Sequence, residues 1–300
     1  MAVMHFGENN TWININSDLI SEYSSIYDTY EIDDEMIEYA LDKNERAHME
    51  YNRRTKTLVV IYNVLNLSRE ENHYDTIPLT FIVRQNQIVT ISNGLNEYII
   101  DQIREELEEN MHWSVFNFLL HSLFAISENY FPVIEKLNKE QQNISKLLRK
   151  KTTKDNLFRL SDLEIEGMYL VSATKQNAVV LEQLKTQQAF KELDDSEREQ
   201  LEDNIIEANQ LVAMTELHLQ ILHQIANTYN NVLNNNLNDT MKFLTGISIL
   251  MTIPDIVTGF FGMNVQIPFT ELRHGWAIIL LIIAFGWIGV SQIIKRIMKD

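Results

Sequence analysis

The sequence predicts an α+β domain followed by a long helical stalk and a hairpin of two transmembrane helices. Three observations carry this fold class. Strand and helix patterns alternate over about the first 125 residues, long helical patterns follow, and the longest apolar runs fall within about the last sixty residues.

Residues 1–125 are expected to form the α+β domain. Residues 58–64 read LVVIYNV and predict a strand, and residues 79–91 hold two β-rich runs around residues 85–87, which predicts a hairpin. Residues 96–110 predict a helix, because apolar residues recur there at helical spacing: Ile99, Ile100, Ile103 and Leu107.

Residues 126–239 are expected to form the helical stalk region. One helix is predicted to run from about His112 to about Lys151. In a capping box, a serine hydroxyl accepts from the third amide of a helix, while a glutamate three residues later accepts from the serine's own amide. Two such boxes predict where the next helices begin: Ser161 with Glu164, and Ser196 with Glu199.

The last long helix is predicted to run unbroken from Glu197 to about Met263. Its first glycine is Gly246 and its first proline is Pro254. Apolar or near-apolar residues recur in steps of three and four, as in a coiled coil: Leu219, Leu222, Ala226, Tyr229, Leu233 and Leu237. A single long helix needs partners to bury such a seam. Two membrane spans per chain are too few to enclose a pore, so oligomerisation follows if the chain forms a pore.

The C-terminal part predicts two membrane-spanning helices, at residues 240–263 and 276–294. Each is about as long as the roughly 20 residues that cross a bilayer. The external loop, residues 264–275, is too short to fold alone, so both chain ends lie on one side. The basic tail, residues 295–300, makes that side the cytoplasm by the positive-inside rule. A pair of buried core helices is the alternative interpretation.

Composition limits the classes of function. The chain has no cysteine, which excludes disulfides and thiolate metal sites. Its formal charge of −17 argues against nucleic acid as a partner and suits a body that attracts cations, although a solvated acidic surface explains it as well. Residues 1–10 lack the apolar core of a signal peptide, so the N-terminal part is expected in the cytosol.

The first span carries a polar stripe at steps of three and four, which suggests a pore-lining face. Its members are Asn238, Met241, Leu244, Ser248, Thr252, Asp255 and Gly259. Hydroxyls in membranes also hold helices together, which is the simpler interpretation of Ser248 and Thr252. Asp255 favours a pore, because an ionisable residue at membrane depth is costly and usually faces water or a partner.

The turn after the first span reads Gly262, Met263 and Asn264, which indicates an ion entrance. This tripeptide and the sequence Asn238-Asp239-Thr240-Met241-Lys242-Phe243-Leu244-Thr245 resemble the CorA family of magnesium and other divalent-cation transport proteins. The resemblance covers nearly the whole chain and is strongest in about the last seventy residues.

The resemblance implies a homopentameric funnel in the cell membrane that carries Mg²⁺ inward, and also Co²⁺ or Ni²⁺. The membrane potential can drive this flux without ATP. Cytosolic Mg²⁺ is expected to gate it by binding between the acidic bodies of the subunits. The family's entrance asparagine maps to Asn264, which would form an outer ring with Gly262. A deeper asparagine ring maps to Asn238, and a hydrophobic constriction to Met241 and Leu244.

Three positions match the family pattern only conditionally or depart from it. Glu271 matches the acidic residue of the family's outer loop if the loop here is one residue longer. Asn227 stands where members often carry an acidic residue at the cytosolic mouth. Asp255 stands where many members have threonine. Asn264, Asp255 and Asn238 are therefore the expected contacts for the metal.

The sequence features also bear on functions other than a Mg²⁺ channel. No P-loop is present, and His218 and His223 lie on different faces of one helix, so an enzyme is not expected. A Zn²⁺ transporter of the related branch is disfavoured by the few histidines and absent cysteines. A membrane-anchored scaffold or signalling protein is the third reading, and the polar stripe argues against it.

Overall fold

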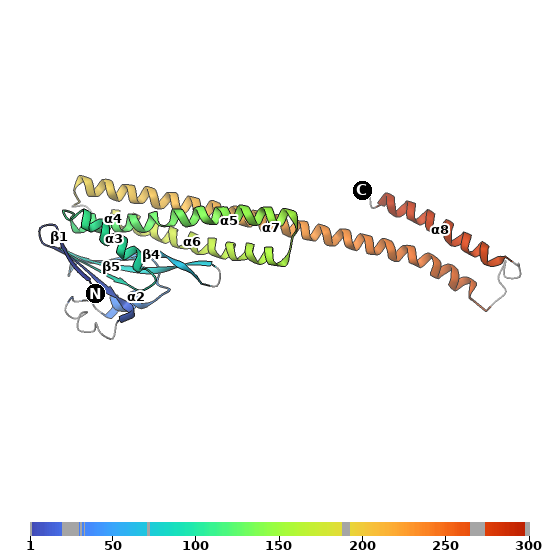
Figure 1. The fold of residues 1–300 in the computed structure, drawn as a ribbon, viewed down its shortest axis with the longest axis horizontal. Coiled ribbons are helices and arrows are strands. Elements are labelled where there is room, and N and C mark those ends of the chain that lie inside the picture. The colour runs from blue at the N-terminus through green and yellow to red at the C-terminus, as the bar shows by residue number, and fades with distance from the viewer. Residues whose placement is uncertain are drawn as a thin grey trace. The chain divides into compact units, whose positions relative to one another are not determined.

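A computed structural model describes residues 2–19, 30, 32, 34–70, 73–187, 193–264 and 274–297. The chain divides into two compact units, Met1–Ala226 and Asn227–Asp300. The first unit contains a sheet and the helices packed on it, and the second contains a helical hairpin (Figure 1). Helix α7, Asp195–Phe261, belongs to both units as one continuous helix of 67 residues.

The sheet of the first unit has six strands in the order β1-β2-β6-β5-β4-β3. The strands are β1 Ala2–Phe6, β2 Asn10–Asn16, β3 His48–Asn52, β4 Thr57–Glu70, β5 His73–Arg84 and β6 Gln87–Ser92. Neighbours are antiparallel except β2 and β6, which are parallel. The predicted strand lies in β4, and the predicted hairpin is β5–β6, closed where Arg84 pairs with Gln87. An α+β domain is confirmed.

Helices cover both faces of this sheet. Successive strand residues point to opposite faces. Ile13 belongs to a buried cluster with Ile82 and Val89 that packs against α2, Asp34–Leu41. Trp12, next to it in β2, instead packs against Phe118 of α4, with ring centroids 5.2 Å apart. Figure 1 shows α2 on one side of the sheet and the longer helices on the other.

The helices of the first unit agree with the sequence in type and differ in their ends. They are η1 Ser17–Leu19, α2 Asp34–Leu41, α3 Glu97–Glu109, α4 Val115–Glu128, α5 Tyr130–Lys150 and α6 Lys154–Thr186. Helix α3 confirms the prediction for residues 96–110, and its four predicted apolar residues are its buried ones.

The single helix expected from His112 to Lys151 is instead two, α4 and α5, separated at Asn129. Pro132 has no N–H to donate to the carbonyl of Glu128, which interrupts the ladder at this point. The Asn129 side chain also donates to the Ala125 carbonyl at 2.7 Å, in competition with backbone donors. The prediction of one helix was therefore wrong.

Both predicted helix starts are corrected as well. Helix α6 begins at Lys154, so Ser161 lies inside it, and the cap is Thr153, whose hydroxyl accepts from the amide of Asn156 at 3.3 Å. Leu160, already buried before the expected start, supports the longer helix.

The capping box of α7 exists but lies two residues earlier than Ser196. Asp194 Oδ1 accepts from the amide of Glu197 at 2.8 Å, and Glu197 Oε2 accepts from the amide of Asp194 at 3.0 Å. Glu197 is buried and also accepts from the Ser114 hydroxyl, the N-cap of α4. This second contact fixes the choice of cap, because it ties the starts of α4 and α7 together.

The apolar seam of α7 packs within the first unit. Leu222 is fully buried, and a Cβ placed on Gly167 of α6 would lie 3.3 Å from Leu219 and 3.6 Å from Leu222. Further along the seam, in the second unit, Leu237 is 60% exposed to solvent. The described residues of a single chain therefore bury only the first part of the seam.

Candidate functional site

The second unit is a hairpin formed by the C-terminal part of α7 and by α8, Gly275–Ile297. Among the described residues, α7 and α8 are long and apolar enough to cross a membrane. Helix α7 ends two residues before residue 263, where the first span was predicted to end, and α8 includes the predicted second span, residues 276–294. Glu271 lies outside the described residues.

Helix α8 packs on one face of α7. A Cβ on Gly286 of α8 would lie 3.0 Å from Ile253, and the indole nitrogen of Trp287 donates to the Leu250 carbonyl. Between Lys242 and Phe261, the α7 residues that are buried or half-buried recur along this face at steps of three and four, apart from Pro254: Gly246, Leu250, Ile253, Val257 and Phe261. We call these five residues the hairpin face.

The predicted pore stripe is exposed and lies away from the hairpin face. At about 100° per residue, the stripe from Leu244 to Gly259 is centred about 180° from the hairpin face. Met241 and Leu244 are 60% and 63% exposed, and Ser248, Thr252, Asp255 and Gly259 are exposed as well. Helix α8 therefore leaves this polar side of α7 uncovered.

The inner end of the stripe lies nearer to α8. Asn238 and Met241 line a pocket of 360 Å³ to which the end of α8 contributes Ile294. The other lining residues are Lys242, Thr245, Gly246 and Ile249. The structure thus brings Asn238 and Met241 together, and it places Leu244 on the open side.

The hydroxyls of the stripe bond within their own helix. Ser248 donates to the Leu244 carbonyl at 3.0 Å and Thr252 donates to the Ser248 carbonyl at 2.9 Å. Among the described residues, neither hydroxyl bonds to α8, so within one chain these hydroxyls do not hold the two helices together. Each hydroxyl oxygen keeps lone pairs that point from the helix surface and can accept from water.

The carboxylate of Asp255 is exposed, and the described residues give it no hydrogen bond or ion pair. The Thr258 hydroxyl donates instead to backbone carbonyls, of Pro254 at 2.7 Å and of Asp255 at 3.4 Å. Asp255 therefore lies on the open side of α7 without a partner from the described part of the hairpin.

The turn at the end of α7 requires glycine at position 262. The amide of Gly262 donates to the Thr258 carbonyl at 2.8 Å, and a Cβ there would lie 2.9 Å from that same oxygen. Any side chain would force the backbone to shift. Gly262, Met263 and Asn264 are all exposed, so the Asn264 carboxamide lies open at the end of the stripe.

Two asparagines in line with the polar stripe were missed by the sequence reasoning. Asn231 and Asn234 are exposed on α7 and continue the stripe from Asn238 toward Asn227 at steps of four and three. Thr245 continues the same spacing beyond Met241. The signal was present in the sequence as an unbroken alternation of fours and threes from Asn227 to Gly259.

The two histidines of α7 have separate partners. Nδ1 of His218 lies 2.8 Å from Oδ1 of Asn138 on α5, whereas Nδ1 of His223 lies 2.9 Å from the Glu164 carboxylate on α6. Burial lowers the pKa of His218 to about 4, so this imidazole is neutral at physiological pH. The two imidazoles therefore contact different helices, α5 and α6.

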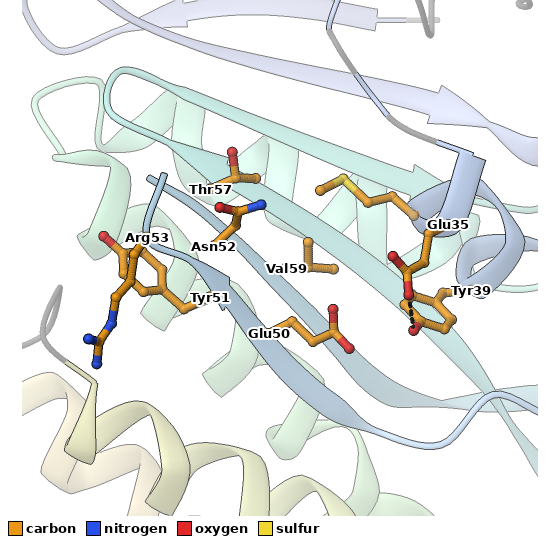
Figure 2. Close-up of a pocket in the computed structure, with 9 residues that line it drawn as sticks. Glu35, Tyr39, Glu50, Tyr51, Asn52, Arg53, Thr57 and Val59 are labelled. Carbon is orange, nitrogen blue, oxygen red and sulfur yellow. Dashed lines mark hydrogen bonds between the residues drawn. The ribbon is translucent and has the colours of Figure 1, made fainter. Parts of the chain in front are cut away.

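The first unit carries an open pocket of 540 Å³ between α2 and strands β3 and β4 (Figure 2). Glu35 and Glu50 line it together with Arg53, and the Tyr39 hydroxyl donates to Glu35 at 2.9 Å. That hydrogen bond raises the pKa of Tyr39 to about 12. Across the described residues, no three or more His, Cys, Asp or Glu side chains are grouped to hold a metal ion. The pocket is therefore not assigned as a metal site.

These two units define a membrane protein with a sheet-containing domain, one long helix and a C-terminal helical hairpin. The chain belongs to the CorA-like Mg²⁺ transporter protein family, which matches residues 7–296. The family assignment from the sequence is confirmed. It is a family of transporters and not a known family of enzymes.

Known relatives match over almost the full length. The chain is 19% identical over 302 residues to the cobalt/magnesium transport protein CorA of Thermotoga maritima, covering 95% of this chain and 81% of that one. The complete structure of the CorA magnesium transporter from Methanocaldococcus jannaschii matches with a TM-score of 0.83 at 19% identity, over 99% of this chain and 93% of that one. The full-length CmaX protein matches with a TM-score of 0.73 at 16% identity, over 97% and 88%. These structural likenesses confirm the predicted fold class.

Proposed function

We propose that this protein is a channel for Mg²⁺ in the cell membrane. One observation carries the proposal: α7 presents an exposed polar stripe, on the side opposite α8, that leads to the exposed carboxamide of Asn264. A lipid-facing helix would show apolar residues there. A stripe that faces water in a membrane needs other copies of the chain to enclose it.

The chain has too few spans to enclose a pore alone, because backbone and polar groups at membrane depth must be shielded from lipid. We propose a homopentamer, as family membership suggests. In it α7 lines the pore, α8 faces lipid, and both termini lie in the cytosol. The basic residues Lys295 and Arg296 after α8 support this orientation.

The chemistry of the stripe suits a hydrated divalent cation. Mg²⁺ is octahedral and releases water reluctantly, so carboxamide and hydroxyl oxygens would bind its water shell without dehydrating it. Weak binding of this kind permits conduction. We assign Gly262, Met263 and Asn264 to the entrance and Glu271 to the external loop. The pore wall would consist of Asn238, Met241, Leu244, Ser248, Thr252, Asp255 and Gly259, continued by Thr245 and by Asn234, Asn231 and Asn227.

Energy for uptake is available without ATP. A membrane potential of 100 mV contributes about 2.3 kcal/mol per elementary charge, so about 4.6 kcal/mol for Mg²⁺. Co²⁺ and Ni²⁺ carry the same charge, and oxygen ligands bind them too, so we propose that they share the pathway. A Zn²⁺ transporter and a membrane-anchored scaffold are not favoured by the family match.

Cytosolic Mg²⁺ is proposed to close the channel. The chain has a formal charge of −17, so subunits in a pentamer would repel one another through their acidic surfaces. A divalent cation between them would relieve this repulsion and favour the closed assembly by a shift of population.

Asn264→Ala tests the entrance. The substitution removes five carboxamides from the proposed outer ring, and Mg²⁺ uptake into proteoliposomes should fall at least about tenfold, which corresponds to about 1.4 kcal/mol. The control is Asn236→Ala, an exposed asparagine on the side of α7 opposite the stripe. Equal uptake by both variants at the wild-type rate would rule out the assignment of the entrance.

A further inference from the structure

The pore-lining part of α7 is interrupted by a proline. Pro254 has no N–H, so the carbonyl of Leu250 lacks the donor that an uninterrupted helix would supply four residues later. At membrane depth no bulk water replaces that donor, and such a carbonyl needs a partner from the protein.

Helix α8 supplies the missing donor. The indole Nε1 of Trp287 donates its single hydrogen to the carbonyl of Leu250. The preceding residue, Gly286, makes the approach possible, because a Cβ there would lie only 3.0 Å from Ile253 of α7. The freed carbonyl, the indole and the glycine therefore meet at one level of the hairpin.

This contact lies next to Pro254, where α7 lacks one of its helical hydrogen bonds. Loss of one helical hydrogen bond next to a proline makes a helix bend there. From Pro254 to the end of α7 at Phe261 there are seven residues, a lever of about 10 Å at 1.5 Å per residue. A change of bend of about 10° would move the end of that lever sideways by about 2 Å.

We propose that Trp287 is a positioning residue for ion entry. It holds α7 to α8 at the proline and so fixes the segment that carries Asp255 and the Gly262–Asn264 entrance. We call the hydrogen bond from Trp287 to the Leu250 carbonyl the clasp. The role in ion entry rests on the proposed function, whereas the clasp does not.

A lipid anchor is the competing role for an aromatic residue of this kind, since tryptophan is common at membrane interfaces. The two roles differ in the atom that matters. An anchor needs the aromatic ring, whereas the clasp needs the indole N–H, and only the clasp becomes redundant when residue 254 recovers its own N–H.

The test is a double-mutant cycle of Trp287→Phe with Pro254→Ala. Phenylalanine keeps a ring and removes the donor, and alanine restores the amide that Leu250 lacks. The control is Trp276→Phe, because Trp276 is 65% exposed in the first turn of α8. Each full-length variant is measured for thermal unfolding in detergent and for the concentration dependence of Mg²⁺ uptake in proteoliposomes.

Trp287→Phe alone should lower the unfolding midpoint by about 2–4 °C. It should also raise the apparent KM for Mg²⁺ about fivefold, which corresponds to about 1 kcal/mol. In the Pro254→Ala background the same change should have no effect on either quantity. Trp276→Phe should leave the unfolding midpoint and the apparent KM unchanged in both backgrounds.

Equal effects of Trp287→Phe in both backgrounds would overturn the clasp. A coupled unfolding midpoint with an unchanged KM would overturn the role in ion entry. If the wild-type protein carried no Mg²⁺, the proposed channel and the role in ion entry would both fall, and the midpoint would still decide on the clasp.

Discussion

Acid is expected to destabilise the first unit through one histidine. His218 is 3% exposed in the interface of α5, α6 and α7, and its Nε2 has no hydrogen-bond partner among the described residues. Burial lowers the pKa of His218 from 6.5 to about 4. The folded state thus binds fewer protons than the unfolded state between these pH values, and stability is lost as pH falls through this window.

The size of the effect follows from the two pKa values. One pKa unit corresponds to 1.36 kcal/mol, so the full loss between pH 6.5 and 4 is about 3 kcal/mol, of which about 2 kcal/mol is lost by pH 5. Above pH 6.5 the imidazole is neutral in both states and contributes no dependence on pH. For a unit of this size, 2 kcal/mol lowers the unfolding midpoint by about 4–8 °C.

The assay is thermal unfolding of the full-length protein in detergent between pH 4 and pH 7.5. His218→Asn removes the titrating group and keeps a donor that can reach Asn138. Between pH 7.5 and pH 5, the unfolding midpoint of this variant should therefore fall by about 4–8 °C less than that of the wild type. His223→Asn is the matched control, because His223 lies on the same helix with its side chain 53% exposed. A wild-type pH profile in the His218→Asn variant would refute the reasoning.

Two further predictions concern conduction. Asp255→Asn removes the charge of the proposed carboxylate ring and should weaken Mg²⁺ block of monovalent current about tenfold, or about 1.4 kcal/mol; wild-type block in single-channel recordings would place Asp255 away from the pore. Raising Mg²⁺ on the cytosolic side from zero to millimolar should reduce the Mg²⁺ current severalfold as the closed population grows. A current that does not respond in excised patches would contradict the proposed feedback.

The sequence by itself determined the kinds of element and most of their places. Local periodicity fixed the helix of residues 96–110 and the β5–β6 hairpin, because apolar side chains at period 3.6 or 2 have only one way to reach a core. The length and apolarity of the two spans predicted the helical hairpin. The Gly262-Met263-Asn264 turn, together with the segment from Asn238 to Thr245, indicated the family.

The tertiary structure decided what depends on partners far apart in the chain. A capping box of the type Ser-x-x-Glu also occurs inside helices, so Ser161 looked like a start, whereas the contact between Glu197 and Ser114 selected Asp194 as the cap of α7. Likewise, the sequence showed that Pro254 lacks a hydrogen. Only the packing of α8 on α7 showed that Trp287, 37 residues beyond Leu250, supplies the donor. Such pairings depend on which surfaces meet, and no local pattern encodes that choice.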